Sequence, residues 1–96
     1  MPTPKLFEPI TFRSVTARNR IAVAPMCQYS ATNGLGDDWH IQHLGARAMG
    51  GAGIVFTEAT HVAAVGRITH HCLGLYTDEH RQFLARGAAI IAPDRP

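Results

Sequence analysis

Apolar and polar positions follow one another along the chain in blocks of different period, and each block predicts a structural element. The opening stretch alternates apolar and polar residues around a tight turn, which predicts a two-stranded β-ribbon near residues 9–19. Two short apolar runs predict strands near residues 20–25 and 54–58, of the kind that is buried on both faces in a parallel sheet. Apolar residues at helical spacing predict helices near residues 38–50 and 78–91.

The order of these elements is typical of βαβ units, which form parallel sheets with right-handed crossovers. The predicted fold class is therefore α/β, either a doubly wound sheet or a (β/α)₈ barrel. Both architectures place their functional residues in loops that follow the carboxyl ends of the strands. The loops to search are residues 26–37 and 59–76.

Local signals mark where the elements begin and end. A turn is expected near Arg13-Ser14, and Pro25 ends the first predicted strand because it cannot donate to a ladder. Asp37 or Asp38 is expected to cap the first helix. The run from Gly50 to Gly53 looks like a phosphate loop, but it follows a helix and precedes a strand, which is the reverse of a dinucleotide loop. We interpret it as a helix C-cap with a tight turn.

The first predicted helix has two distinct faces. Its core-facing stripe is expected to consist of Ile41, Leu44, Gly45, Ala48 and Met49. His40, His43 and Arg47 fall on another face, where the two histidines are expected to make hydrogen bonds at the helix surface. A metal site is the alternative interpretation, with the adjacent His70 and His71 as further histidines and Cys72 as a third ligand. The spacing matches no recognised zinc pattern, and no metal is predicted.

Composition excludes several classes of function. The chain has 96 residues, 46% of them hydrophobic, and a formal net charge of +2. Its basic residues are scattered, unlike those of a nucleic-acid-binding surface. No apolar run approaches the roughly 20 residues of a membrane span, and the N-terminus lacks the apolar region of a signal peptide. Cys27 and Cys72 make no disulfide framework, so the cytoplasm is the expected compartment.

A second candidate site follows the first predicted strand, in the segment from Ala24 to Tyr29. On barrel geometry its side chains point at the mouth of the barrel. The thiol of Cys27, beside Met26 and the donor hydroxyl of Tyr29, is suited to contact a flat conjugated ligand. A buried structural cysteine is the alternative interpretation.

Several segments in fixed order resemble one family. They are Leu6-Phe7-Glu8-Pro9-Ile10, Arg18-Asn19-Arg20-Ile21, Ala24-Pro25-Met26-Cys27-Gln28-Tyr29, Asp38-Trp39-His40-Ile41-Gln42-His43-Leu44, Gly51-Ala52-Gly53, Glu58-Ala59 and Gly66-Arg67-Ile68-Thr69. Together they resemble the Old Yellow Enzyme family of flavin-dependent ene-reductases, and the Met26-Cys27 pair is typical of its thermophilic-like xenobiotic reductase branch. The resemblance covers residues 6 to about 85.

The resemblance implies an N-terminal β-ribbon and the first two βα units of a (β/α)₈ TIM barrel that holds FMN at its mouth. NADPH or NADH reduces the flavin, which passes hydride to an alkene conjugated to a carbonyl or nitro group. The implied partner is therefore a small molecule, and neither nucleic acid nor a membrane is an expected partner. Members of the branch commonly pair, so a homo-oligomer is also expected.

Site residues are also implied by the resemblance, position by position. Cys27 is expected to modulate the flavin, Tyr29 to hydrogen-bond the substrate oxygen, and Ala59 to leave room for the flavin. The residues expected along the flavin ring are Ala24, Pro25, Met26 and Cys27.

Residues 1–96 are thus interpreted as the N-terminal portion of an FMN-binding barrel domain, with residues 92–96 as a tail outside the family pattern. The family's substrate-binding histidines, proton-donating tyrosine and phosphate-binding arginine have no counterpart here, so no complete catalytic set is expected in this chain. Two alternatives stay open: a truncated, non-catalytic remnant, or a small oligomerising interaction module.

Overall fold

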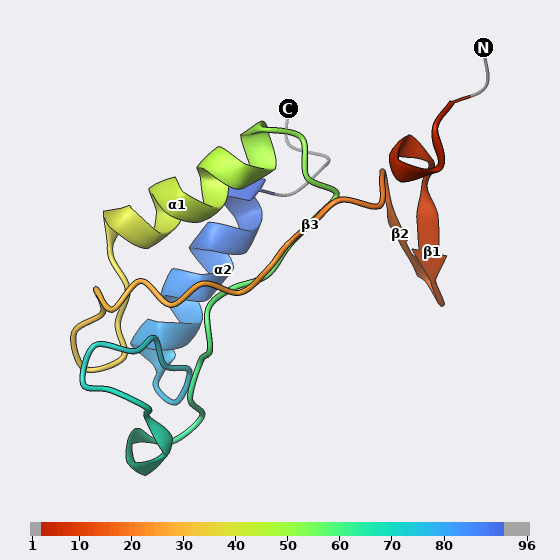
Figure 1. Ribbon diagram of the computed structural model, residues 1–96. Coiled ribbons are helices and arrows are strands. Elements are labelled where there is room, and N and C mark those ends of the chain that lie inside the picture. Colours follow the sequence, from red (N-terminus) through yellow and green to blue (C-terminus); the bar gives the residue numbers. More distant parts are fainter. Residues whose placement is uncertain (1–2, 92–96) are drawn as a thin grey trace.

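The computed structural model describes residues 3–91, which form an elongated body of 51 × 27 × 25 Å (Figure 1). A β-ribbon lies at one end, two helices lie side by side in the middle, and long loops gather at the other end. The elements in chain order are η1 (Lys5–Phe7), β1 (Ile10–Phe12), β2 (Val15–Ala17), β3 (Ala22–Val23), α1 (Asp38–Met49), β4 (Ile54–Val55), η2 (Ala64–Gly66) and α2 (Asp78–Ile91).

The predicted ribbon is confirmed by β1 and β2, which pair antiparallel. Phe12 pairs with Val15, which leaves only Arg13 and Ser14 in the turn. Arg13 has a φ of 56°, in the left-handed region that two-residue hairpin turns require. The hydroxyls of Thr11 and Thr16 meet across the ribbon at 2.9 Å.

The two predicted barrel strands are confirmed as a parallel pair, with Ala22 opposite Ile54 and Val23 opposite Val55. Each is shorter than predicted, because within residues 3–91 each strand has a partner on one side only. The expectation that both strands are buried on both faces is wrong. Ala22 is exposed and the other three paired residues are half-buried, since helices cover a single face of this sheet.

Helix α1 begins where the sequence indicates, and Asp37 is its N-cap. The Asp37 carboxylate accepts a hydrogen bond from the Trp39 backbone N–H at 2.9 Å. The helix ends at the glycine run as predicted, with Gly50 as C-cap and Gly51 at a φ of 110°.

The predicted core-facing stripe of α1 is confirmed at four positions, because Ile41, Leu44, Gly45 and Ala48 are all half-buried. The prediction is wrong for Met49, which is 88% exposed. Met49 lies at the last turn of α1, where it lines an open hollow of about 820 Å³ between β2, α1 and α2. No element of residues 3–91 fills that hollow.

Helix α2 packs against α1, and a glycine of α2 lies within this contact. Gly87 is buried, and a Cβ placed on it would lie 3.4 Å from Cδ1 of Ile41. Thr77 caps the helix, since its hydroxyl accepts the backbone N–H of His80 at 3.2 Å. Residues 92–96, predicted as a non-family tail, lie outside the described residues. Neither described helix has the length and apolar character needed to cross a membrane.

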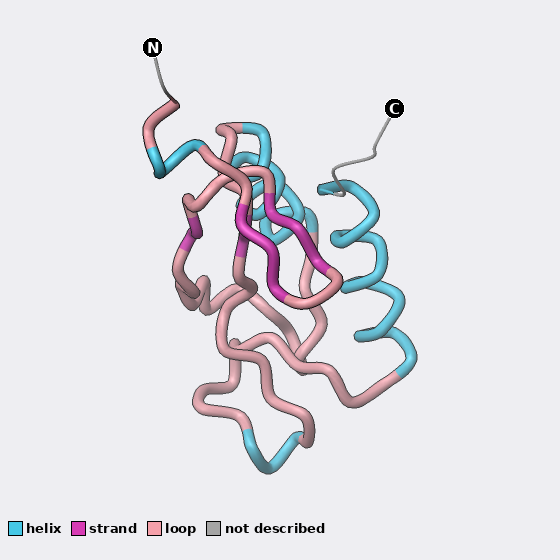
Figure 2. Tube along the Cα trace, turned by 90° about the vertical axis from the view of Figure 1, so that its right-hand side faces the viewer, coloured by secondary structure: helices cyan, strands magenta, loops and turns pink. Residues whose placement is uncertain are grey.

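Two long loops lie side by side at the end opposite the ribbon, and the irregular segments fill the lower part of Figure 2. The first loop turns tightly at Asn33-Gly34, where both residues have positive φ and Thr32 and Leu35 exchange backbone hydrogen bonds of 3.0 and 2.9 Å. The second loop crosses the first, because Gly74 N–H donates to the Gly34 carbonyl at 2.9 Å.

Candidate functional site

The parallel pairing of β3 and β4 determines where the candidate site lies. The backbone N–H of Phe56 donates to the Val23 carbonyl at 3.2 Å, so both strands end at the same edge. The segment after β3 and the segment after β4 therefore leave the sheet next to each other (Figure 1). This is the edge at which α/β folds bind their ligands.

The predicted flavin-facing residues lie at this edge, and two of them are alanines. Ala24, Pro25 and Met26 are exposed and Cys27 is half-buried, while Ala59 is exposed one residue beyond a buried glutamate. Within residues 3–91 the backbone N–H groups of Met26 and Cys27 find no acceptor. The edge thus presents the small side chains of Ala24 and Ala59, the larger side chain of Met26, and free backbone donors.

Tyr29, the predicted substrate-binding residue, stands out from the surface. Its side chain is 59% exposed and its φ is 53°, in the left-handed region that non-glycine residues rarely adopt. The Ser30 hydroxyl donates to the Gln28 carbonyl at 2.9 Å and braces the backbone on both sides of Tyr29. The phenol is therefore presented outward at a constrained backbone position.

Glu58 is the residue at this site whose role the sequence analysis missed. It lies three residues after the end of β4, and its side chain is only 4% exposed. Its Oε2 accepts the backbone N–H of Gln28 at 3.3 Å, and its Oε1 accepts that of Leu73 at 3.3 Å. The signal available in the sequence was a charged residue at the carboxyl end of the strand predicted near residues 54–58, where a parallel strand directs side chains to the functional edge.

Gln28 continues these contacts toward helix α1. Its side-chain Nε2 donates to the Met26 carbonyl at 2.8 Å, and its Oε1 accepts the indole N–H of Trp39 at 2.9 Å. Backbone and side chain of one glutamine thus connect the end of β4, the segment after β3 and the first turn of α1.

His40 corrects an expectation, because it is buried with 2% exposure and does not lie at the helix surface. Its Nδ1 accepts the backbone N–H of Asp37 at 3.1 Å, which completes the capping box and leaves the ring proton of the neutral form on Nε2. Nε2 lies 3.8 Å from Glu58 Oε2. The ring also meets Phe83 edge to face, with centroids 5.9 Å apart, so α2 covers it. Helix packing across α1 and α2 decides this burial.

His43 lies one turn further along α1 and has a lowered pKa. The largest cause is burial, which disfavours the imidazolium, and the positive charge of Arg47 lowers the pKa further. Glu58 opposes both effects, and His40 adds a smaller lowering. The neutral form of His43 is therefore favoured beside the Glu58 carboxylate.

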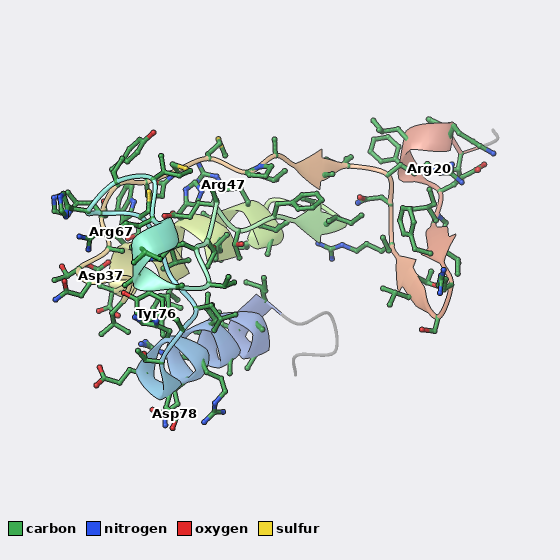
Figure 3. The ribbon with its side chains drawn as sticks, turned by 90° about the horizontal axis from the view of Figure 1, so that it is seen from below. Arg20, Asp37, Arg47, Arg67, Tyr76 and Asp78 are labelled. Carbon is green, nitrogen blue, oxygen red and sulfur yellow. The ribbon has the colours of Figure 1, made fainter. Side chains whose placement is uncertain are left out.

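A second group of aromatic and histidine side chains joins the two loops to α2. Tyr76 lies between His61 and His80, with ring centroids 5.3 and 4.4 Å away. His80 Nδ1 accepts the Tyr76 backbone N–H at 3.1 Å, and its Nε2 donates to the Asn33 carbonyl at 3.0 Å. In Figure 3, Asp37, Arg67 and Tyr76 lie at this same end of the molecule, far from Arg20 beside the ribbon.

The candidate metal ligands from the sequence contact different groups in the structure. His71 Nδ1 meets the Ala31 carbonyl at 3.2 Å, and the Cys72 sulfur lies 3.2 Å from the Thr69 hydroxyl. Among residues 3–91 no three histidine, cysteine or acidic side chains are grouped as a metal site would need. Cys27 and Cys72 are both free thiols.

The fold and this edge are those of a βα barrel whose strands deliver their functional loops to one mouth. The chain belongs to the NADH:flavin oxidoreductase / NADH oxidase family, whose model matches residues 5–87. The resemblance to Old Yellow Enzymes is thereby confirmed, and the family is one of oxidoreductases whose names specify FMN and a nicotinamide cofactor.

Curated relatives include the NADPH dehydrogenase of Bacillus cytotoxicus, which is 46% identical over 89 residues, covering 91% of this chain and 26% of that protein. An NADH:flavin oxidoreductase of Gibberella zeae is 48% identical over 82 residues, covering 85% of this chain and 20% of that protein. The chain therefore spans about a quarter of the length of the curated relatives it matches.

Solved structures agree on the fold. The Old Yellow Enzyme homologue of Zymomonas mobilis matches with a TM-score of 0.82 and 28% identity, over 92% of this chain and 24% of that chain. Morphinone reductase matches with a TM-score of 0.83 at 24% identity, over 92% of this chain and 23% of that chain. The predicted fold class, a ribbon with the first two βα units of an incomplete barrel, is confirmed.

Proposed function

We propose that this chain supplies the first two βα units of an FMN-dependent NAD(P)H oxidoreductase that reduces alkenes conjugated to a carbonyl or nitro group. One observation carries the proposal. The parallel pairing of β3 and β4 places the segment after Val23 and the segment after Val55 at one edge, inside the region that the family model matches.

The residues at this edge fit a flat cofactor. Ala24 and Ala59 are exposed and carry only a methyl group, so a ring can approach the backbone closely. The N–H groups of Met26 and Cys27, which have no acceptor within residues 3–91, are suitable donors for the polar rim of a flavin. Pro25, directly before Met26, restricts the backbone at the end of the strand. FMN supplies hydride transfer when it is bound there.

Cys27 is the residue we propose to tune the cofactor. Its half-buried thiol lies between the exposed Met26 side chain and the backbone of Gln28, which Glu58 holds. Sulfur is soft and polarizable, so it stabilises the oxidised and reduced forms of a neighbouring ring to different extents. Cys27 would thereby modulate the cofactor without taking part in covalent chemistry.

Tyr29 is the residue we propose to orient the substrate. The residue is 59% exposed, which leaves its side chain accessible to a ligand. A phenol donates one hydrogen bond, which suits the carbonyl or nitro oxygen of a conjugated alkene. The proposed partners are therefore a small unsaturated substrate and NADPH or NADH. The free thiols of Cys27 and Cys72 suit the reducing cytoplasm that we propose as the compartment.

The test is a completed barrel, in which residues 1–87 of this chain replace the matching region of the Bacillus cytotoxicus NADPH dehydrogenase. We expect a yellow protein with FMN bound one to one and NAD(P)H-dependent reduction of cyclohexenone. The unmodified relative is the control for expression and cofactor loading. A completed barrel that folds, as judged by circular dichroism, but stays colourless with excess FMN would refute the proposed function.

A further inference from the structure

We propose that Glu58 is a positioning residue, which holds the Met26–Tyr29 segment in place against the ends of β3 and β4. The part of this proposal that concerns the flavin rests on the proposed function. The part that concerns the backbone rests on the contacts of Glu58 alone.

The burial of Glu58 is the first argument. Its side chain is 4% exposed, and a buried carboxylate is costly unless hydrogen bonds compensate the lost water. The compensation comes from two different segments, since Oε2 accepts from Gln28 and Oε1 from Leu73, each at 3.3 Å. One side chain therefore connects the two loops at the functional edge. His40 Nε2, 3.8 Å from Oε2 and 3% exposed, shields this oxygen from a third direction.

The second argument is what the bond to Gln28 does to its neighbours. Glu58 holds the backbone N–H of Gln28. The Gln28 side chain makes two further bonds, from its Nε2 to the Met26 carbonyl at 2.8 Å and from the Trp39 indole N–H to its Oε1 at 2.9 Å. Cys27 lies between a fixed Met26 carbonyl and a fixed Gln28 N–H. Its backbone is therefore constrained on both sides, although its own N–H has no acceptor within residues 3–91.

Loss of the Glu58 acceptor leaves the part-buried Gln28 N–H unpaired, which favours rearrangement of the segment. Glu58→Gln keeps one acceptor oxygen and replaces the other with an NH2 group. This NH2 group cannot accept a hydrogen bond from the backbone N–H that faces it, so one of the two bonds is lost. Glu58→Ala removes both acceptors. The effects on Cys27 should therefore increase from the wild type to Glu58→Gln to Glu58→Ala.

The first readout is the rate at which Cys27 is alkylated, followed by peptide mapping in the 96-residue chain and in the apo form of the completed barrel. We expect the rate to rise about tenfold in Glu58→Gln, the factor that one lost hydrogen bond produces, and further in Glu58→Ala. Glu79→Gln and Glu79→Ala are matched controls on the exposed first turn of α2 and should react like the wild type. Unchanged Cys27 alkylation in both Glu58 variants would overturn the proposal.

A second measurement decides the case if the Glu58 variants do not fold. Hydrogen exchange of the wild-type completed barrel in its apo form should show protected amides at Gln28 and Leu73 and fast exchange at Met26 and Cys27. Equal exchange at Gln28 and Cys27 would contradict the proposal.

The third readout separates this proposal from the proposed function. In the FMN-bound completed barrel, Glu58→Gln should shift the flavin reduction potential and weaken FMN binding about tenfold, whereas Glu79→Gln should change neither. A wild-type barrel that binds no FMN refutes the proposed function, while the alkylation rates still decide whether Glu58 holds the segment. Faster Cys27 alkylation with an unchanged potential and unchanged FMN affinity would overturn the effect on the flavin.

Discussion

Gly53 packs directly against Asn19, which leaves no space for a side chain at position 53. A Cβ on Gly53 would come within 2.5 Å of Asn19 Oδ1 and 2.7 Å of the Asn19 carbonyl oxygen. The Asn19 side chain is itself held, because Nδ2 donates to the Gly51 carbonyl at 2.7 Å and Oδ1 accepts the Ile21 N–H at 3.0 Å. This contact aligns the starts of β3 and β4, and therefore also their ends at the functional edge.

Gly53→Ala should accordingly destabilise the protein, because backbone atoms of Asn19 cannot move aside as a flexible side chain would. We expect a loss of about 1–3 kcal/mol in the free energy of unfolding, measured by urea denaturation of the completed barrel. Gly45→Ala is the matched control: a Cβ there meets nothing within 4 Å, and alanine favours the helix by up to about 1 kcal/mol. Equal stabilities of the two variants would contradict this interpretation of Gly53.

Substitution of Cys27 should act on the flavin more than on folding. In the completed barrel, Cys27→Ser and Cys27→Ala should shift the reduction potential and the substrate KM, because a polarizable sulfur is removed from the proposed ring site. The free energy of unfolding should change by no more than about 0.5 kcal/mol, since this thiol is only half-buried. Cys72→Ala, at a buried thiol, should instead lower stability and leave the potential unchanged. Equal potentials in wild type and both Cys27 variants, by spectroelectrochemical titration, would refute the role.

The lowered pKa of His43 predicts a pH dependence of stability. In the unfolded chain this histidine titrates near its usual value of about 6.5. Between the lowered folded-state pKa and that value, the unfolded chain binds a proton that the folded chain does not. The contribution of His43 is therefore fully present above about pH 6.5 and is lost as the pH falls through this window.

His43→Gln should remove this part of the pH dependence. Urea denaturation of the completed barrel at about pH 5 and about pH 7.5 gives the comparison, and the wild type should lose more stability on acidification than the variant. His70→Gln, at an exposed histidine, is the control and should behave like the wild type. Parallel pH profiles for wild type and His43→Gln would contradict the effect of burial and Arg47.

A polypeptide of residues 1–96 should be oligomeric and colourless when purified with excess FMN. Within residues 3–91, both strands of the parallel sheet have an unpaired edge, which invites pairing with other chains. Apolar side chains are also left in solvent, with Met49 88%, Val65 96% and Ile68 74% exposed. Light scattering, the visible spectrum and a cyclohexenone assay test this, and a yellow monomer with turnover would overturn it.

The amino-acid sequence by itself determined the order and type of the elements. The ribbon turn at Arg13-Ser14, the Asp37 cap and the helix end at Gly50 all depend on neighbours a few residues away, and all are where the pattern predicted them. The ordered family segments likewise indicated the barrel, and the match over residues 5–87 confirms it.

Only the tertiary structure decided which side chains are buried and what they bond. His40 lies on what looks like a polar face of α1, yet α2 covers it through Phe83. Met49 lies on the apolar stripe and is exposed, because no described element fills the hollow that it lines. Glu58 owes its role to backbone groups 30 and 15 residues away along the chain. Periodicity describes the faces of an element, whereas burial and hydrogen bonding depend on distant segments that pack against those faces.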